Sequence, residues 1–464
     1  MAHLVFVEIT ALGVQSIAYA KRQGHEVTLL RSPLYDFITP PAERAEAERL
    51  ADRTLYAPDL QDAEVLRALL AEHGTGPGDV DAVLSTLSLC VLPAARLAER
   101  LGARGTPYEG AAAARDKGRC REILRAAGVP SLGFAVVTAL PEALRAADTI
   151  GYPVVIKPVS GVGKAVTSIV ADAAGLRAHF AAAAEELRAM EPGLAAELDE
   201  RYIVEELAVG ELYSVEVAAD GERFTPLVAV GRKMGRDNPV LELGCTVPSG
   251  LLAAEEAELG AYAAEVCRAL GLGLGIFHVE VMRTERGFRL IETNPRISGG
   301  SLPDSVRLAT DRNLFEILVD LFLGAPTPSG PLPWRRAASH TFLAAAHDTV
   351  VPADLPADWF EEFRPRLHSG FSRAVPGGRL RAMNGNFDPF GLIRVLDTDP
   401  DRAAEECARV RGDIEKRLGF PLTAVAERAL TGAGARAGAG AGAGADAGAD
   451  AAAAEPVAAQ GGGR

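Results

Sequence analysis

The fold is decided by two neighbouring stretches, IFHVEVMR at residues 276–283 and GFRLIETNPR at residues 287–296. Both alternate between apolar and other side chains and are joined by a short turn, which predicts two antiparallel strands. Alternation places Glu280 on one face of the first strand. Glu292 lies at the end of the second strand, and Asn294 follows two residues later and points the same way. Glu280 and Glu292 are therefore expected to lie side by side.

These oxygen-bearing side chains predict a metal site formed by Glu280, Glu292 and Asn294. Carboxylate and amide oxygens suit Mg²⁺, with Mn²⁺ as an alternative, because such an ion keeps several waters and takes phosphate ligands. Two facing carboxylates in an apolar sheet repel each other and lose their solvation, and a divalent ion removes both costs. The apolar neighbours of the glutamates count against an acidic surface hairpin. Arg296 is then expected beside the metal site, at a phosphoryl or carboxylate oxygen.

Composition narrows the class of protein. The chain has 464 residues, of which 48% are hydrophobic and 24% charged, enough for about three domains with full cores. A net charge of −14 disfavours nucleic acids and anionic membranes as main partners. The chain has no long apolar run, and the N-terminus is expected to be a first strand and not a signal peptide. The five scattered cysteines form no pattern typical of zinc or disulfide frameworks, so we expect a cytoplasmic protein.

The order of the predicted elements indicates an α/β and α+β multidomain fold. Strands alternating with helices predict a Rossmann-like domain with a parallel sheet at residues 1–112. Hairpins and helices follow at 113–325, and a stretch rich in proline and glycine then leads to a small α+β domain at 326–430. Residues 431–464 are almost all Ala and Gly, which predicts a disordered tail.

A glycine loop follows the strand GYPVVIK at 151–157, which ends in Lys157. The loop contains Ser160, Gly161 and Gly163. Backbone N–H groups in such a loop can approach phosphate oxygens closely, and a nearby lysine supplies countercharge. The loop is not a P-loop, because the first glycine and the Ser or Thr after the lysine of that motif are missing. From these residues alone, a plain hairpin loop is the alternative.

The segment VEEL at 204–207 ends another predicted strand. A carboxylate at a strand end could hydrogen-bond a purine edge and a ribose. A solvated acidic turn is the alternative, and without other motifs it is favoured.

Taken in order, these motifs resemble the ATP-grasp superfamily over residues 114–324. RDK at 115–117 is similar to the start of the helix that carries the family's first nucleotide lysine, and Lys157 matches the second. Residues 160–166 resemble the phosphate loop, and VEEL resembles the adenine-binding hinge. The resemblance implies an ATP-grasp fold with Mg²⁺ on the three oxygen ligands. It also implies that ATP is bound by Lys117, Lys157, Ser160, Gly161, Gly163, Glu205, Glu206, Leu207 and Glu211.

Within the superfamily, the chain is most similar to the L-amino-acid (dipeptide) ligases. GRK at 231–233 with LELGCTVP at 241–248 resembles the loop before that branch's amphipathic helix, and NPRISGGSLP at 294–303 resembles its substrate loop. This likeness implies catalytic roles for Arg296 and Lys157. It also implies a substrate site at Lys233, Glu242, Arg296, Gly299 and Gly300.

The implied reaction joins two small molecules, a carboxylate and an amine, through an acyl phosphate, with ADP and phosphate as products. A homodimer is expected from the family. Two alternatives stay open: a carboxylase or ring-closing ligase with another acceptor, and a nucleotide-binding module without turnover.

Overall fold

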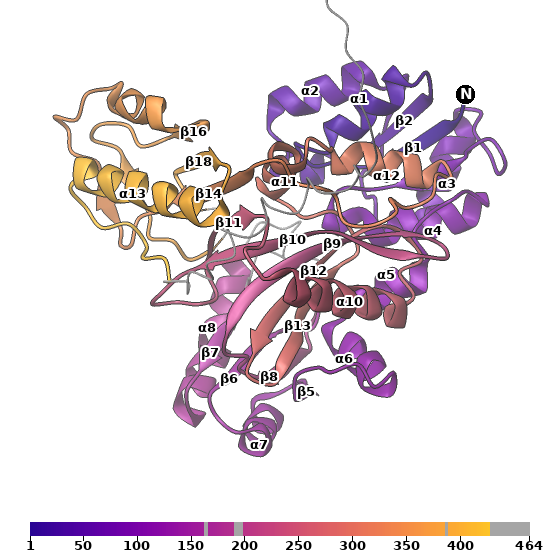
Figure 1. The fold of residues 1–464 in the computed structure, drawn as a ribbon. Coiled ribbons are helices and arrows are strands. Elements are labelled where there is room, and N and C mark those ends of the chain that lie inside the picture. Colours follow the sequence, from indigo (N-terminus) through magenta and orange to yellow (C-terminus); the bar gives the residue numbers. More distant parts are fainter. Residues whose placement is uncertain (162–165, 190–197, 386–387, 427–464) are drawn as a thin grey trace, which may run out of the picture.

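The computed structural model describes residues 1–161, 166–189, 198–385 and 388–426, which form a large body with a smaller lobe beneath it (Figure 1). Gly163 of the predicted phosphate loop and the predicted tail at 431–464 lie outside the described residues. Three larger sheets organise the rest. Among the described residues, no helix combines the length and the apolar character that crossing a bilayer requires.

The N-terminal sheet is parallel, as predicted, with strand order β3-β2-β1-β4. Its strands are β1 (His3–Val7), β2 (Glu26–Arg31), β3 (Arg53–Tyr56) and β4 (Ala82–Leu84). Alternate residues of β1 enter two different hydrophobic cores, so both faces of this sheet are covered, as in other parallel sheets. The covering helices are α1 (Val14–Arg22), α2 (Pro41–Leu50), α3 (Ala63–Glu72) and α4 (Val91–Leu101).

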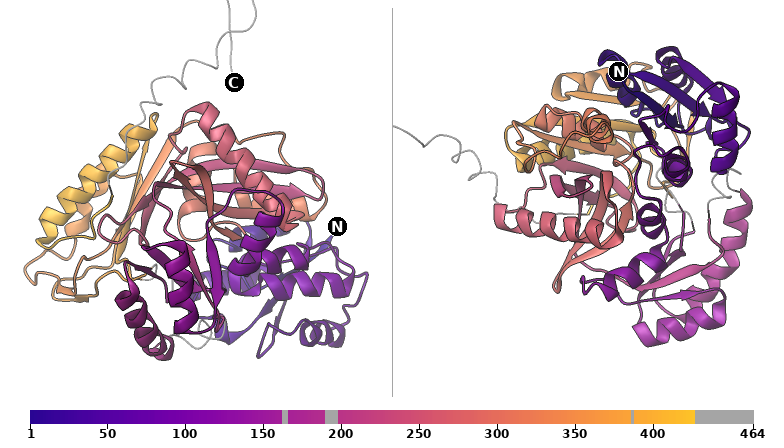
Figure 2. Two further views of the ribbon diagram at one scale, coloured as in Figure 1. Left: turned by 90° about the horizontal axis from the view of Figure 1, so that it is seen from below. Right: turned by 90° about the vertical axis from the view of Figure 1, so that its right-hand side faces the viewer.

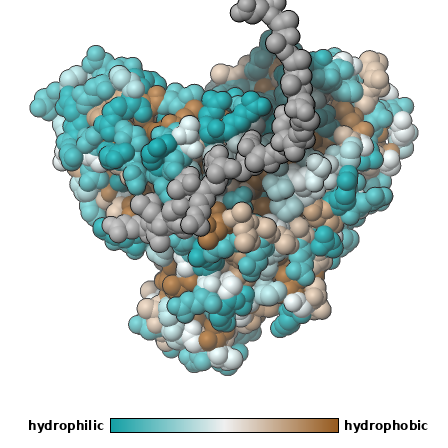
Figure 3. Space-filling model, in the orientation of Figure 1, coloured by the Kyte–Doolittle hydropathy of each residue, from teal (hydrophilic) through white to brown (hydrophobic). Residues whose placement is uncertain are grey.

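A second, antiparallel sheet forms the lobe at the bottom of the molecule (Figures 1 and 3). Its strand order is β5-β8-β6-β7, with β5 (Phe134–Val137), β6 (Val154–Pro158), β7 (Ser168–Val170) and β8 (Tyr202–Glu206). The helices α7 (Leu140–Ile150) and α8 (Ala173–Ala189) pack on it around a core that includes Ile156 and Val204.

Two helices connect the N-terminal sheet to this lobe, where the sequence predicted a helix at 115–127. The observed helices are α5 (Tyr108–Arg115) and α6 (Lys117–Ala126). The break lies at Asp116, whose backbone is extended and whose side chain accepts a hydrogen bond from the backbone N–H of Arg119, as an N-cap does. The break places Lys117 in the first turn of α6.

The largest sheet is antiparallel, with strand order β13-β12-β9-β10-β11-β14-β18-β16. Its strands are β9 (Glu211–Asp220), β10 (Phe224–Met234), β11 (Glu242–Val247), β12 (Leu274–Thr284), β13 (Gly287–Asn294), β14 (Ala337–Leu343), β16 (Ser369–Ser372) and β18 (Gly391–Asp397). Residues 241–248, expected to form a loop, mostly form β11. Because β11 pairs with β14, the sheet crosses residue 325, and the domain boundary proposed there remains a prediction.

Different helices cover the two halves of the large sheet. Among them α10 (Ala253–Leu270) packs on β9 and β10, and α13 (Pro400–Leu418) packs on β14 and β18. The helices α11 (Leu302–Thr310) and α12 (Leu314–Phe322) follow β13, and α12 packs against α1 of the N-terminal sheet. Consequently α13 and the N-terminal sheet lie on opposite sides of the molecule (Figures 1 and 2).

Candidate active site

Glu280 of β12 and Glu292 of β13 are direct neighbours across the strand pair, as the sequence predicted. On its other side, Glu280 faces Ser214 of β9. Glu280 is buried, whereas the Glu292 side chain is 29% exposed, so the pair opens toward solvent at the β13 edge. Asn294 faces His278 across the same two strands and lies on the same face as the glutamates.

Cationic side chains neutralise both carboxylates. The Nζ atom of Lys117 lies 3.0 Å from Oε1 of Glu292. Nε2 of His278 lies 3.3 Å from Oε1 of Glu280, and its Nδ1 lies 2.7 Å from Oε1 of Glu216 on β9. Burial acts to lower the pKa of His278, but Glu216 and Glu280 outweigh it and raise this pKa to about 9.

The donor set fits a divalent cation such as Mg²⁺. Two carboxylates and the amide of Asn294 share one face, and Nη2 of Arg296 lies 3.5 Å from Oδ1 of that amide. Within the described ranges, no three His, Cys, Asp or Glu side chains gather closely enough to hold an ion by themselves. Mg²⁺ is commonly bound by one or two carboxylates together with waters and substrate phosphates, so this set is sufficient for an ion that arrives with a nucleotide.

Lys157, at the end of β6, lies in a buried ion-pair group. Its Nζ atom is 2.7 Å from Oε2 of Glu205, whose Oε1 is 2.7 Å from Nε of Arg121. Burial alone would raise the pKa of Glu205, but the two cations hold it at about 2. The predicted nucleotide ligand Glu205 is thus engaged by Lys157 and Arg121. Burial lowers the pKa of Lys157, while the charges of Glu205 and, more weakly, Glu292 oppose this effect.

Arg121 of α6 is a site residue that sequence reasoning missed. It is fully buried, and its Nη2 donates to the carbonyl oxygen of Ile291, the residue before Glu292. One guanidinium thus joins the small sheet, through Glu205, to strand β13 of the large sheet. Only its position in the helix that starts with Lys117 could have indicated this role.

The other predicted nucleotide residues lie at strand ends, and Glu206 is paired with Val154, at the opposite end of β6 from Lys157. Glu206 accepts a hydrogen bond from the backbone N–H of Gly133 at 3.0 Å and pairs with Arg286. Glu211, at the start of β9, accepts a hydrogen bond from the Tyr213 hydroxyl at 2.7 Å. Leu207 follows β8 directly, and Ser160 and Gly161 follow β6.

The structure separates two of the predicted substrate residues, Lys233 and Glu242. A register shift between β10 and β11 places Glu242 on the face of Arg232, and these two side chains form an ion pair. Lys233 points to the opposite face, since neighbours on a strand alternate. There its Nζ bonds to Ser339 Oγ at 2.7 Å and to Thr341 Oγ1 at 2.9 Å. Arg232, which was not predicted as a site residue, lies on the face of the acidic site in place of Lys233.

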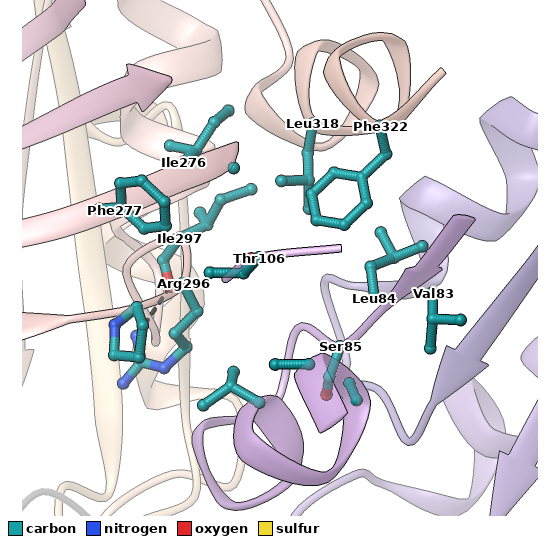
Figure 4. Close-up of a pocket in the computed structure, with 15 residues that line it drawn as sticks. Val83, Leu84, Ser85, Thr106, Ile276, Phe277, Arg296, Ile297, Leu318 and Phe322 are labelled. Atoms are coloured by element: carbon teal, nitrogen blue, oxygen red, sulfur yellow. Dashed lines mark hydrogen bonds between the residues drawn. The ribbon is translucent and has the colours of Figure 1, made fainter. Parts of the chain in front are cut away.

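Arg296 stands where the N-terminal sheet meets the large sheet. Its Nε donates to Oγ of Ser88, in the short 3₁₀ helix Ser88–Cys90, and its Nη1 donates to the carbonyl oxygen of Ile297 at 2.7 Å. Burial lowers its pKa, against the charges of Glu216 and Glu292. Figure 4 shows Arg296 beside a small pocket whose apolar wall includes Leu318 and Phe322 of α12. The predicted substrate residues Gly299 and Gly300 follow in an exposed loop.

Comparisons with known proteins confirm the ATP-grasp resemblance. Residues 150–304 match the ATP-grasp domain family. Carnosine synthase 1 of Gallus gallus is 31% identical over 348 residues, which are 73% of this chain but 34% of that protein. The chain thus spans about a third of the length of that relative. Alanine–anticapsin ligase of Bacillus subtilis strain 168 is 26% identical, covering 71% of this chain and 75% of the relative.

A solved structure supports the same fold. The L-amino acid ligase of Bacillus licheniformis superposes with a TM-score of 0.71 at 18% identity, over 91% of this chain and 99% of that one. The predicted multidomain fold with an ATP-grasp domain is therefore confirmed.

The buried group around Glu205 makes a prediction about stability. Glu205→Gln leaves Lys157 and Arg121 without their carboxylate, and removing one partner of a buried pair typically costs about 3–5 kcal/mol. Urea denaturation at pH 7 should show a loss of this size, whereas Glu206→Gln, at the neighbouring half-exposed position, should change stability by less than about 1 kcal/mol.

The stability difference between wild type and Glu205→Gln is expected to depend on pH. The folded pKa of Glu205 is about 2 against an ordinary 4.5, so its stabilisation is full above pH 4.5 and is lost as the pH falls toward 2. The stability difference between wild type and Glu205→Gln should stay constant from pH 8 to 6 and narrow below pH 4.5. A difference that is absent at pH 7 would show that the group does not form.

Proposed function

We propose that this chain, whose residues 150–304 form an ATP-grasp domain, is an ATP-dependent ligase that joins a carboxylate to an amine. The observation that carries the proposal is the in-register pair Glu280 and Glu292, with Lys117 in contact with Glu292. Nucleotide binding by itself requires only cationic side chains that hold the phosphates. Two carboxylates beside such a side chain are explained if the phosphates arrive with a metal ion and one of them is transferred.

Lys117, at the start of α6, and Lys157, at the end of β6, would hold ATP phosphates. Each lysine is paired with a carboxylate that orients it, Glu292 for Lys117 and Glu205 for Lys157. Ser160 and Gly161 would cover the phosphates, and the segment from Glu206 to Leu207 would meet the adenine. Glu205 would position the Lys157 side chain for this contact. When bound to Glu280, Glu292 and Asn294, Mg²⁺ would offset phosphate charge. This role for the cations and donors matches phosphoryl transfer, which depends on positioning and charge neutralisation.

In the first step, an oxygen of the substrate carboxylate attacks the γ-phosphorus of ATP, and the bond to the β-phosphate oxygen breaks. The products are an acyl phosphate and ADP. In the second step, the amine nitrogen attacks the acyl carbon, phosphate leaves with its oxygen, and the nitrogen gives up a proton. Arg296, beside Asn294 and the exposed glycine loop, would stabilise negative charge on the carboxylate and on the tetrahedral intermediate.

Amino acids are the proposed substrates, because two of the similar proteins are an alanine–anticapsin ligase and an L-amino acid ligase. The pair Arg232–Glu242 and the loop with Gly299 and Gly300 line the proposed substrate side. The expected homodimer and cytoplasmic location remain part of the proposal.

The reaction is tested by measuring ADP release with pooled amino acids, Mg²⁺ and ATP. Wild type should release ADP and, with hydroxylamine present, yield hydroxamates from the trapped acyl phosphate. Glu292→Gln should lower the rate by at least about 100-fold, because it removes a ligand of the metal ion that would offset the charge of the transferring phosphate. Glu285→Gln, in the exposed turn seven residues earlier, should keep the wild-type rate.

Absence of ADP release with every pool would instead favour a binding module without turnover. ADP release without hydroxamates or amides would favour a ligase with another acceptor.

Nucleotide binding gives a separate prediction. Lys157→Gln removes a buried cation from the phosphate site, and we expect calorimetry to show at least about tenfold weaker ATP binding, a loss of about 1.4 kcal/mol. Lys416→Gln, at an exposed lysine of α13, is the matched control. An ATP affinity equal to wild type in Lys157→Gln would contradict the placement of ATP at β6.

A further inference from the structure

We infer that His278 and Glu216 are positioning residues that link the proposed metal ligand Glu280 to the glycine loop at 298–301. The inference rests on the proposed function, because it assigns roles around the same site. Neither residue was among the candidate site residues that the sequence predicted.

The first link joins His278 to Glu280. These residues are two apart on β12, so their side chains share a face, and Nε2 of His278 contacts Oε1 of Glu280 at 3.3 Å. Both are more than nine-tenths buried. The contact holds one oxygen of the Glu280 carboxylate and so restricts the rotation of this side chain. Groups in the shell behind a metal ligand orient it in this way and commonly contribute to metal affinity.

The second link joins His278 to the glycine loop through Glu216. Glu216 is the cross-strand partner of His278 on β9, and its Oε1 lies 2.7 Å from the imidazole Nδ1. Its other oxygen, Oε2, accepts a hydrogen bond from the backbone N–H of Ser298 at 3.3 Å. One carboxylate therefore holds both the ring behind Glu280 and the first residue of the loop.

Packing alone does not explain these charged side chains. The residues beside them on the two strands, Phe277, Val279, Val215 and Val217, point to the opposite face of the sheet, and all four are fully buried and apolar. Apolar side chains of similar volume would fill the same space without the desolvation cost of a buried ion pair. Nη1 of Arg232 approaches Nε2 of His278 at 3.5 Å and brings a further charged side chain into this group. A buried network of this kind costs stability unless all its members are paired, which favours a functional origin.

The test measures Mn²⁺ binding by electron paramagnetic resonance in the presence of a non-hydrolysable ATP analogue. In His278→Asn, the amide can replace Nδ1 toward Glu216 but cannot reach Glu280, and Mn²⁺ binding should weaken about tenfold. In His278→Gln, the amide reaches the position of Nε2, and binding should stay within about threefold of wild type. His3→Asn changes a buried strand histidine with two ring contacts far from this site and should have no effect.

Glu216→Ala separates the two links. It should weaken Mn²⁺ binding as His278→Asn does, and it should also raise about tenfold the amino-acid pool concentration that gives half-maximal ADP release. His278→Asn should leave that concentration unchanged, because the bond to Ser298 remains. Wild-type Mn²⁺ affinity in His278→Asn overturns the inference while the proposed function stands. No Mn²⁺ binding by the wild-type protein overturns both.

Discussion

Two carboxylates held in register on adjacent strands constrain the rest of this structure. Glu280 and Glu292 cannot move apart, because the ladder between β12 and β13 fixes their spacing. Like charges at that spacing repel, so each must be compensated. Lys117 compensates Glu292 from helix α6, and His278 compensates Glu280 from the same strand. The acidic pair therefore determines which side chains must surround it.

Those compensating side chains come from all three larger sheets or from the helices between them. Arg121 bonds both to Glu205 of the small lobe and to the backbone carbonyl of Ile291, the residue before Glu292. Lys157 pairs with the same Glu205 carboxylate. The N-terminal region contributes Ser88, which holds Arg296 just past the C-terminal end of β13. This region has no phosphate motif of its own, yet its Ser88 helps to position Arg296, the arginine proposed to act on substrate. The site thus depends on the assembly of the whole chain.

Much of this could be predicted from sequence where a pattern is local. The pair of strands around Glu280 follows from periodicity, and its expected position agrees with the structure. Long-range contacts left no such signal. The burial of Glu205 depends on Arg121 from a distant helix, and the separation of Lys233 from Glu242 depends on a register shift in β11. His278 was within reach of prediction, since it lies two residues before Glu280, but its partner Glu216 was not.

The central claim is that Glu280 and Glu292 share a divalent ion that faces bound nucleotide. Crystals grown with Mn²⁺ and a non-hydrolysable ATP analogue, measured at the manganese absorption edge, test it most directly. The account predicts an anomalous peak between the two carboxylates, with their oxygens and a phosphate oxygen at roughly 2.0–2.3 Å. Nucleotide density near Lys157 without such a peak, or a peak away from both glutamates, would contradict it.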